Sequence, residues 1–211
     1  MKQTKKQEVN RMDKDMKQAI LDLMDKLGTI DYIQPETIPS IELYMDQVTS
    51  FIDGQLAGSK RHDDDKLLTK TMINNYTKND LLPPPVKKKY SKEHLLSLIF
   101  IYYLKNILSI SDIHTILSPI TEKYFGNKDG KNLEDIYSVI FQMEKEESTK
   151  ILKEYSKKYN IAKNTFNDFP EEDQEMLQTF SFICLLSFDI YMKKQLIEKL
   201  VDDVIEKKEI D

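Results

Sequence analysis

Polar side chains that can contact nucleic acid occupy one side of a short helix predicted over residues 70–78. On a helical wheel at about 100° per residue, the polar arc of this segment contains lysine, threonine and asparagine but no acid. Its members are Lys70, Thr71, Asn74, Asn75 and Lys78. Lysine binds phosphate oxygens, and an asparagine amide can pair with the N6/N7 edge of adenine in the major groove. The arc therefore predicts a surface that reads double-stranded DNA, with a merely solvated polar face as the plain alternative.

A basic cluster surrounds this helix in an otherwise acidic chain. Seven lysines and one acid, Asp80, lie between Lys66 and Lys92, which gives this segment a formal charge of +6. The whole chain of 211 residues carries −5, so the remainder carries −11. Three of the lysines, 87–89, are consecutive and directly precede Tyr90. Because concentrated positive charge attracts the phosphate backbone, the cluster predicts a second contact to DNA.

Helices are expected to position these residues, because five glycines are too few for a hairpin-rich β architecture. Apolar residues spaced by three and four predict amphipathic helices over residues 7–28 and about 44–56. Thr69 can cap the polar helix, and the three prolines after Leu82 can stop it. Ser91 can cap a further helix that is apolar on every side, which is typical of a buried helix.

The C-terminal part is predicted to be helical throughout. Ser109–Asp112 forms a capping box for a short helix that should end before Pro119. Further helices are expected at about 132–146, 148–159 and 169–208. The last one carries an apolar stripe typical of a helix-pairing seam: Ile183, Leu186, Ile190, Ile197, Leu200 and Val204. The stripe predicts a homodimer, and enclosure of an unknown small-molecule effector is the alternative use of this apolar bulk.

The central part of the chain resembles a known family. Its segment TMINNYTKNDLLPPPVKKKYSKEHLLSLIFIYYLKNILSISDIHTIL is similar to the winged helix-turn-helix of MerR-type transcriptional regulators. The matching positions are Ile73, Tyr76, Leu81, Leu82, Pro83, Pro84, Tyr90, Ser91, Leu95, Leu98, Ile101, Leu104, Ser109, Asp112 and Ile113. More closely, LYMDQV, LTKTMINNYTK and PPPVKKKYS resemble domain of unknown function 1836, a family regarded as MerR-like. The chain departs from the MerR pattern where Asn74-Asn75 replaces Arg-Tyr, and lysines replace the arginines of the wing.

The resemblance implies a mostly α fold. A MerR-like winged helix-turn-helix with a small β wing would occupy residues 37–120. An N-terminal amphipathic helix and linker would precede it over 1–36, and a helical dimerisation or effector region would follow over 121–211. Helix 70–80 would then enter the major groove while the wing crosses the backbone. The residues expected to contact DNA are Lys70, Thr71, Asn74, Asn75, Tyr76, Lys78, Lys87, Lys88, Lys89 and Tyr90.

The sequence lacks the residue patterns that most other classes of function require. Cys184 is the only cysteine, which excludes an internal disulfide and a Cys-x-x-Cys zinc site, and we expect it to be a small core residue. His62 and Asp63–Asp65 are consecutive, and consecutive residues rarely converge on one metal ion. Without a glycine-rich phosphate loop or a nucleophile motif, we expect neither enzymatic activity nor a cofactor. Neither a signal peptide nor an apolar segment long enough to span a membrane is found, so a cytoplasmic protein is expected.

Two functions remain open from the sequence. The first is a DNA-binding transcriptional regulator that acts as a homodimer. The alternative is a protein-interaction module, a homodimeric adaptor with the MerR-like fold but no sequence-specific DNA binding. The salt dependence of DNA affinity separates the two, because several lysine–phosphate contacts require a steep slope.

Overall fold

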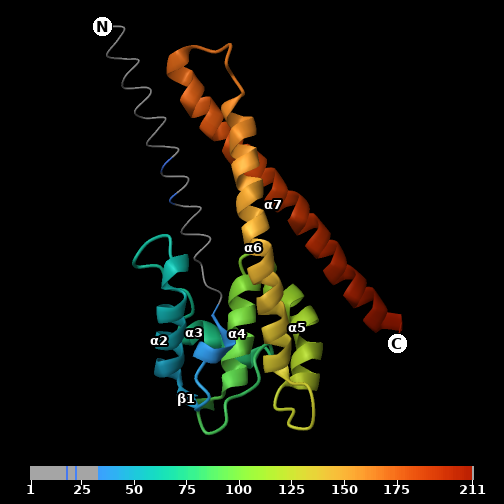
Figure 1. The fold of residues 1–211 in the computed structure, drawn as a ribbon. Helices are drawn as coiled ribbons and strands as arrows, with labels where there is room; N and C mark the ends of the chain where they lie inside the picture. Colours follow the sequence, from blue (N-terminus) through green and yellow to red (C-terminus); the bar gives the residue numbers. More distant parts are fainter. Residues whose placement is uncertain (1–17, 19–21, 23–32, 211) are drawn as a thin grey trace. The chain divides into compact units, whose positions relative to one another are not determined.

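The computed structural model describes Gln18, Asp22 and residues 33–210 (Figure 1). The amphipathic helix expected over residues 7–28 lies, apart from Gln18 and Asp22, outside the described residues. The chain divides into two compact units. We call Tyr32–Met143 with Lys194–Asp211 the mixed unit, and Met1–Asp31 with Glu144–Lys193 the helical unit.

The structure is mostly helical, as expected, and includes one small antiparallel sheet. In chain order the elements are η1 (Pro35–Thr37), β1 (Leu43–Tyr44), α2 (Met45–Gln55), η2 (Ala57–Ser59), α3 (Lys70–Lys78), β2 (Lys89–Tyr90), α4 (Lys92–Leu104), α5 (Ile110–Tyr124), α6 (Leu133–Lys163) and α7 (Glu171–Ile210). β1 pairs with β2 so that Leu43 lies opposite Tyr90 and Tyr44 lies opposite Lys89. Within the described residues, no helix is both long and apolar enough to cross a membrane.

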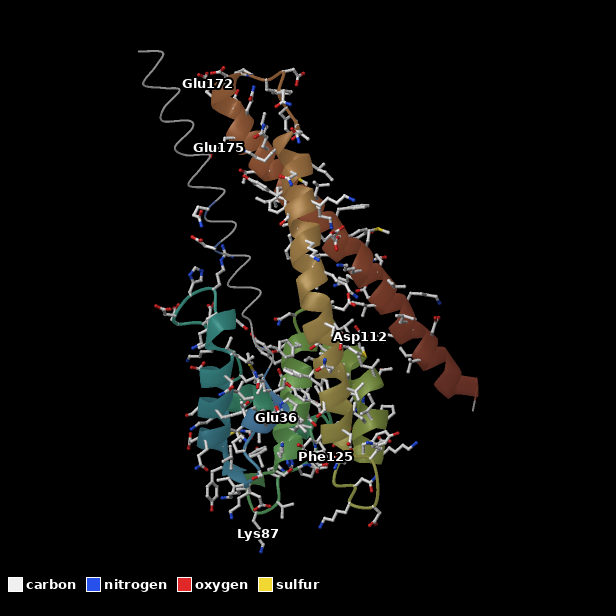
Figure 2. All side chains as sticks on the ribbon, in the orientation of Figure 1. Glu36, Lys87, Asp112, Phe125, Glu172 and Glu175 are labelled. Carbon is white, nitrogen blue, oxygen red and sulfur yellow. The ribbon has the colours of Figure 1, made fainter. Side chains whose placement is uncertain are left out.

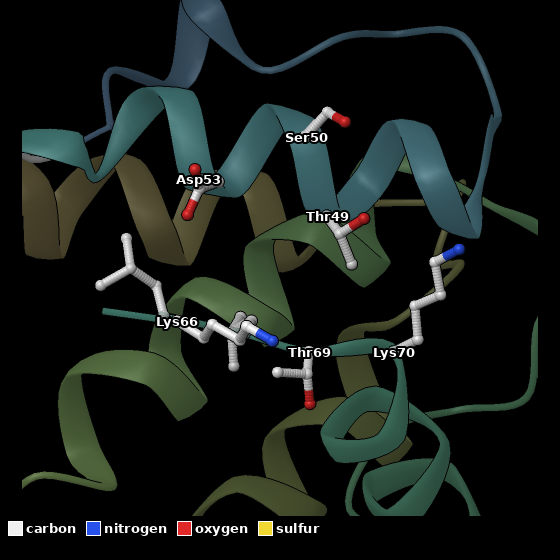
Figure 3. Close-up of a pocket in the computed structure, with 8 residues that line it drawn as sticks. Thr49, Ser50, Asp53, Lys66, Thr69 and Lys70 are labelled. Carbon is white, nitrogen blue, oxygen red and sulfur yellow. The ribbon is translucent and has the colours of Figure 1, made fainter. Parts of the chain in front are cut away.

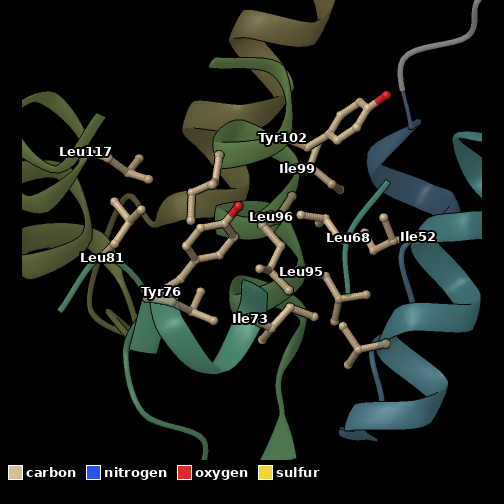
Figure 4. Packing of buried hydrophobic residues seen from close by; sticks show 14 of the residues in the cluster. Ile52, Leu68, Ile73, Tyr76, Leu81, Leu95, Leu96, Ile99, Tyr102 and Leu117 are labelled. Carbon is tan, nitrogen blue, oxygen red and sulfur yellow. The ribbon is translucent and has the colours of Figure 1, made fainter. Parts of the chain in front are cut away.

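The core of the mixed unit is built around α4. Buried apolar residues occur on every side of this helix, which confirms the expectation for a helix that lacks a polar face. The fully buried members include Leu95, Leu96, Leu98, Ile99 and Ile101. Figure 4 shows Ile73 and Tyr76 of α3 packed against α4, with Ile52 of α2 on the other side of the cluster. The core therefore fixes one face of α3 and leaves the opposite face exposed.

The first turn of α4 also holds the segments that follow it. Lys92 Nζ lies 2.7 Å from Glu134 Oε1 at the start of α6. The backbone N–H of Gly126 donates to Glu93 Oε2 at 2.8 Å. The imidazole of His94 is buried and meets the ring of Phe125 edge-on at 4.8 Å. Three consecutive side chains thus tie the N-terminus of α4 to the segment that links α5 and α6.

Two expected helix boundaries are wrong. α5 begins at the predicted capping box but continues through Pro119 to Tyr124. Leu117 and Thr121 are buried on either side of the proline, so packing outweighs the lost backbone hydrogen bond. α6 is one helix over Leu133–Lys163 where the sequence predicts two, since neither glycine nor proline occurs at the expected break. α7 is a single long helix, as expected.

Candidate nucleic-acid interface

α3 presents one face to the core and one face to solvent. Thr69 caps it as predicted, because its Oγ1 accepts the backbone N–H of Met72 at 3.2 Å. The helix ends at Lys78 rather than at residue 80. Asp80 takes a left-handed conformation with φ 56°, and the N–H of Leu81 turns back to the carbonyl of Tyr76 at 2.9 Å. This closure is a Schellman-type end, so α3 stops before the prolines are reached.

The polar arc of α3 is exposed along its whole length. Its members are Lys70, Thr71, Asn74, Asn75 and Lys78. Among the described residues, the side-chain amides of Asn74 and Asn75 have no hydrogen-bond partner. The neighbouring Asn79 differs, because its Nδ2 donates to the carbonyl of Asn75 at 2.8 Å and so helps to close the helix end. Two asparagine amides flanked by lysines are thus available to a ligand.

Lys87 and Lys88 form the tip of a tight hairpin. Val86 and Lys89 exchange backbone hydrogen bonds of 3.1 and 2.9 Å, which leaves only two residues in the turn. The φ angles of Lys87 and Lys88 are 50° and 64°, so the turn has the type I′ geometry that asparagine and glycine normally adopt. Both lysines are exposed, and Figure 2 shows the side chain of Lys87 directed away from the ribbon. A left-handed backbone at a non-glycine residue costs about 1–2 kcal/mol, so this tip is strained.

Two acids on the adjacent elements neutralise part of this basic surface. Lys70 forms an ion pair with Asp46 in the first turn of α2. Lys89 lies 3.8 Å from Glu42 and places its ammonium 5.7 Å from the centre of the Tyr44 ring. The helical wheel of α3 could not reveal these acids, because they come from a different segment. Exposed ion pairs contribute little, so both lysines can exchange their carboxylates for phosphates at small cost.

The segment that carries these features matches a protein family. Residues 33–140 match the family described as Domain of unknown function (DUF1836). The chain belongs to this family. No curated protein and no solved structure gives a significant match. The DUF1836 segment contains α2, α3, the hairpin, α4, α5 and the start of α6, so the whole candidate interface lies within it.

Two residues of the DUF1836 segment that were expected to contact DNA belong to the core instead. The side chains of Tyr76 and Tyr90 are only 7% and 3% exposed. Burial raises the pKa of both phenols, and the ring of Tyr90 meets His94 edge-on at 5.4 Å. Residue type alone does not show which way a tyrosine points, and the cluster around α4 draws both rings inward. They support the polar surface from beneath and are left out of the interface.

The loop of residues 60–66, which precedes α3, is held by hydrogen bonds and an ion pair. Asp65 Oδ2 accepts the backbone N–H groups of Arg61 and His62 at 3.0 and 2.9 Å. Lys60 forms an ion pair with Asp53 of α2 at 2.8 Å. Asp65 therefore stabilises the turn of its own loop. This agrees with the interpretation of residues 62–65 as a solvated loop and not as a metal site.

An open pocket lies between this loop end and α2. It has a volume of about 400 Å³ and is bordered by residues 66–70 and by Thr49, Ser50 and Asp53 of α2 (Figure 3). Lys66 and Lys70 stand at its edge, beside the capped N-terminus of α3. Ligand sites are usually enclosed clefts that bury most of the ligand, whereas this pocket is open to solvent. A small-molecule effector remains a prediction from the sequence.

Proposed function

We propose that this protein is a DNA-binding transcriptional regulator built on a MerR-like winged helix-turn-helix. In this proposal α2 and α3 form the helix-turn-helix, α3 enters the major groove, and the hairpin of residues 86–89 is the wing. The observation that carries the proposal is the arrangement of α3. Two asparagine amides that have no hydrogen-bond partner in the described part of the chain lie between Lys70 and Lys78, on a face that the core holds in place.

Each part of the surface has a distinct task in this proposal. Asn74 and Asn75 carry no charge, so their contribution must come from base edges. Lys70 and Lys78 would bind the phosphates on either side of the groove, and Lys87 and Lys88 would bind phosphates from the wing. A nine-residue helix reads few bases alone, so the proposal includes a homodimer that binds two half-sites.

The strain in the hairpin tip supports the same proposal. Asparagine and glycine would form the two-residue turn at lower cost, yet the chain has Lys87 and Lys88 there. Backbone strain of this kind is commonly found where a side chain has to be presented to a ligand. Two adjacent ammonium groups on a rigid tip suit an anion, and in double-stranded DNA that anion is the phosphate backbone.

Selection of bound duplexes from random DNA at physiological salt tests this proposal. A regulator should enrich one sequence, and its affinity should fall with salt by about 0.9 logarithmic units per phosphate contact. With Lys70, Lys78, Lys87 and Lys88 in contact, the slope should be roughly −3 to −4 for each protomer. A chain that enriches no sequence and shows a flat salt dependence would refute it.

The second candidate is the protein-interaction module. The ion pairs of Lys70 with Asp46 and of Lys89 with Glu42 favour it, because carboxylates beside the basic surface repel phosphate. In that case the polar face of α3 would bind a protein of mixed charge. Asp46→Asn separates the two candidates, since removal of this acid should tighten binding to DNA and weaken binding to a partner that uses it.

A further inference from the structure

Within the helical unit, α7 uses one side to pack against α6. Phe182 meets Tyr159 of α6 edge-on at 5.6 Å, and Asp189 forms an ion pair with Lys158 of the same helix. Nearer its start, the buried Gln178 donates from Nε2 to the carbonyl of Thr165 at 3.1 Å. Gln178, Phe182 and Asp189 are spaced by four and seven positions, so they define a single face of the helix.

The opposite side of α7 is apolar, and none of the other described residues covers it. Met176, Phe180, Ile183 and Ile190 are 65%, 60%, 54% and 65% exposed. With the exposed Ser187 between the last two, their spacing is four, three, four and three. We call these five residues the open seam. This regular alternation is the heptad pattern of a coiled coil, in which a second helix covers the seam.

The open seam differs from the stripe that the sequence predicts. Of the expected dimer residues, Ile183 and Ile190 belong to it, whereas Leu186 is half-buried. Ile197 lies in the mixed unit and packs against its core, next to the buried Val201. Val204 is also half-buried, and Leu200 is exposed but on the flank of the heptad pattern. The sequence thus predicts an apolar stripe without showing which part of it the chain itself covers.

We infer that a second copy of this chain covers the open seam, with its α7 antiparallel to the first. The charges at the two ends of the seam support this occupant. The first turn of α7 contains Glu171, Glu172 and Asp173, and Figure 2 labels Glu172 there and Glu175 just after it. Lys193 lies beyond the other end, and the seam between contains no charge. An antiparallel pair puts Glu172 of each copy opposite Lys193 of the other, whereas a parallel pair brings acid against acid.

The sizes of the seam residues fit the same arrangement. In the antiparallel register that aligns Glu172 with Lys193, Phe180 meets Ile183 of the second copy. Met176 then meets Ser187, so the long flexible side chain fills the space that the small one leaves. A single copy therefore provides complementary shapes for itself, which is the requirement of a two-fold interface.

The surface area that the dimer would bury sets its expected affinity. Four large side chains that are more than half exposed would bury on the order of 1,000 Å² in total across the pair, near the lower limit for specific interfaces. The dimer should therefore form in the micromolar range rather than as an obligate unit. This inference specifies the homodimer of the proposed function, but it stands on α7 alone and does not depend on DNA binding.

Sedimentation of the full-length chain without DNA, over a range of micromolar concentrations, tests the seam. We expect a reversible monomer–dimer equilibrium. Phe180→Glu should weaken it by at least ~30-fold, the size of an interface hot spot. Phe188→Glu is the matched control, because Phe188 is 62% exposed on the same helix but lies off the seam. A parent chain that stays monomeric, or equal effects of the two substitutions, would overturn the inference.

Charge reversal tests the antiparallel direction. Glu172→Lys and Lys193→Glu should each weaken the dimer, and the two together should restore it. A double variant no tighter than the single variants would overturn the arrangement. Monomeric parent protein that self-associates once residues 1–31 are removed would show instead that the N-terminal segment covers the seam. None of these experiments involves DNA, so their results leave the proposed DNA binding to be tested separately.

Discussion

α4 and residues 176–190 of α7 are both strongly apolar, yet they have opposite environments. α4 is buried on every side by elements of its own unit. α7 packs one side against α6 and leaves Phe180, Ile183 and Ile190 exposed. The difference shows that an apolar helix sequence predicts that the helix will be covered. It does not predict whether the cover comes from the same chain or from another molecule. α3 lies between these extremes, because its apolar face packs against α4 and its polar face is exposed.

The largest expected effect contrasts the two apolar helices directly. Leu96→Ala in α4 should lower the free energy of unfolding by about 2–5 kcal/mol, because it leaves a cavity in a packed core. Ile183→Ala in α7 should change it by less than about 0.5 kcal/mol in dilute monomer, as a surface substitution does. Urea unfolding at low concentration measures both. Equal losses would mean that the seam is already covered within one chain.

The next effect concerns the exposed face of α3. Asn74→Ala and Asn75→Ala should each cost about 1–3 kcal/mol in binding to the selected duplex and little on scrambled DNA. Fluorescence anisotropy with both duplexes measures this, and unfolding curves check that the fold is unchanged. Asn79→Ala is the control, because its amide already closes the end of the helix. Asparagine variants that bind both duplexes like the parent would exclude α3 as the reading helix.

The hairpin tip should show opposite effects on stability and on binding. Replacement of Lys87 by Asn and Lys88 by Gly relieves two left-handed residues and should raise the free energy of unfolding by about 1–2 kcal/mol. The same variant should bind selected and scrambled DNA equally more weakly, with a salt slope reduced by up to about two. Thermal unfolding and anisotropy over a salt series measure the two effects. Unchanged DNA affinity would remove the wing from the interface.

The smallest effect concerns the buried N-terminus of α4. Burial lowers the pKa of His94 below its ordinary value, and its Nδ1 accepts the N–H of Ser91 at 3.0 Å. The unfolded chain therefore binds the proton more readily. The stability from neutral His94 is complete above about pH 6.5 and is lost as the pH falls, at no more than about 1.4 kcal/mol per pH unit.

His94→Gln isolates this contribution, because glutamine can keep the reciprocal capping bond without titrating. Urea unfolding of parent and variant on both sides of pH 6.5 should show a smaller drop toward acid in the variant. His114→Gln is the control, since this histidine lies on α5 and is not fully buried. A variant with the same acid sensitivity as the parent would assign the effect to other groups.

Local signals in the sequence predicted much of this structure. Thr69 and the capping box of Ser109 start their helices as expected, because a cap depends on neighbours three residues away. The end of α5, the unbroken α6 and the inward direction of Tyr76 depend on packing that the local sequence does not contain. The same applies to the candidate site. Its polar arc follows from helix periodicity, whereas Asp46 reaches Lys70 only through the fold.

Two further features of the structure could not be predicted from the sequence. Cys184 is exposed, although its apolar neighbours predict a core residue, because the side of α7 that carries it has no covering element among the described residues. The tight turn at Lys87 and Lys88 was also unexpected, since neither asparagine nor glycine marks it. Its backbone conformation is imposed by the pairing of β1 with β2 and by the burial of Tyr90.

The two-residue turn also restricts how the family can vary. Side chains alternate across a strand, so one extra residue between Val86 and Lys89 would shift the register by one position. Tyr90, which now lies opposite Leu43 and faces the core, would then point to solvent. Relatives should therefore keep two residues at the tip, whereas the loop between α2 and α3, which sets no strand register, can accept insertions and deletions.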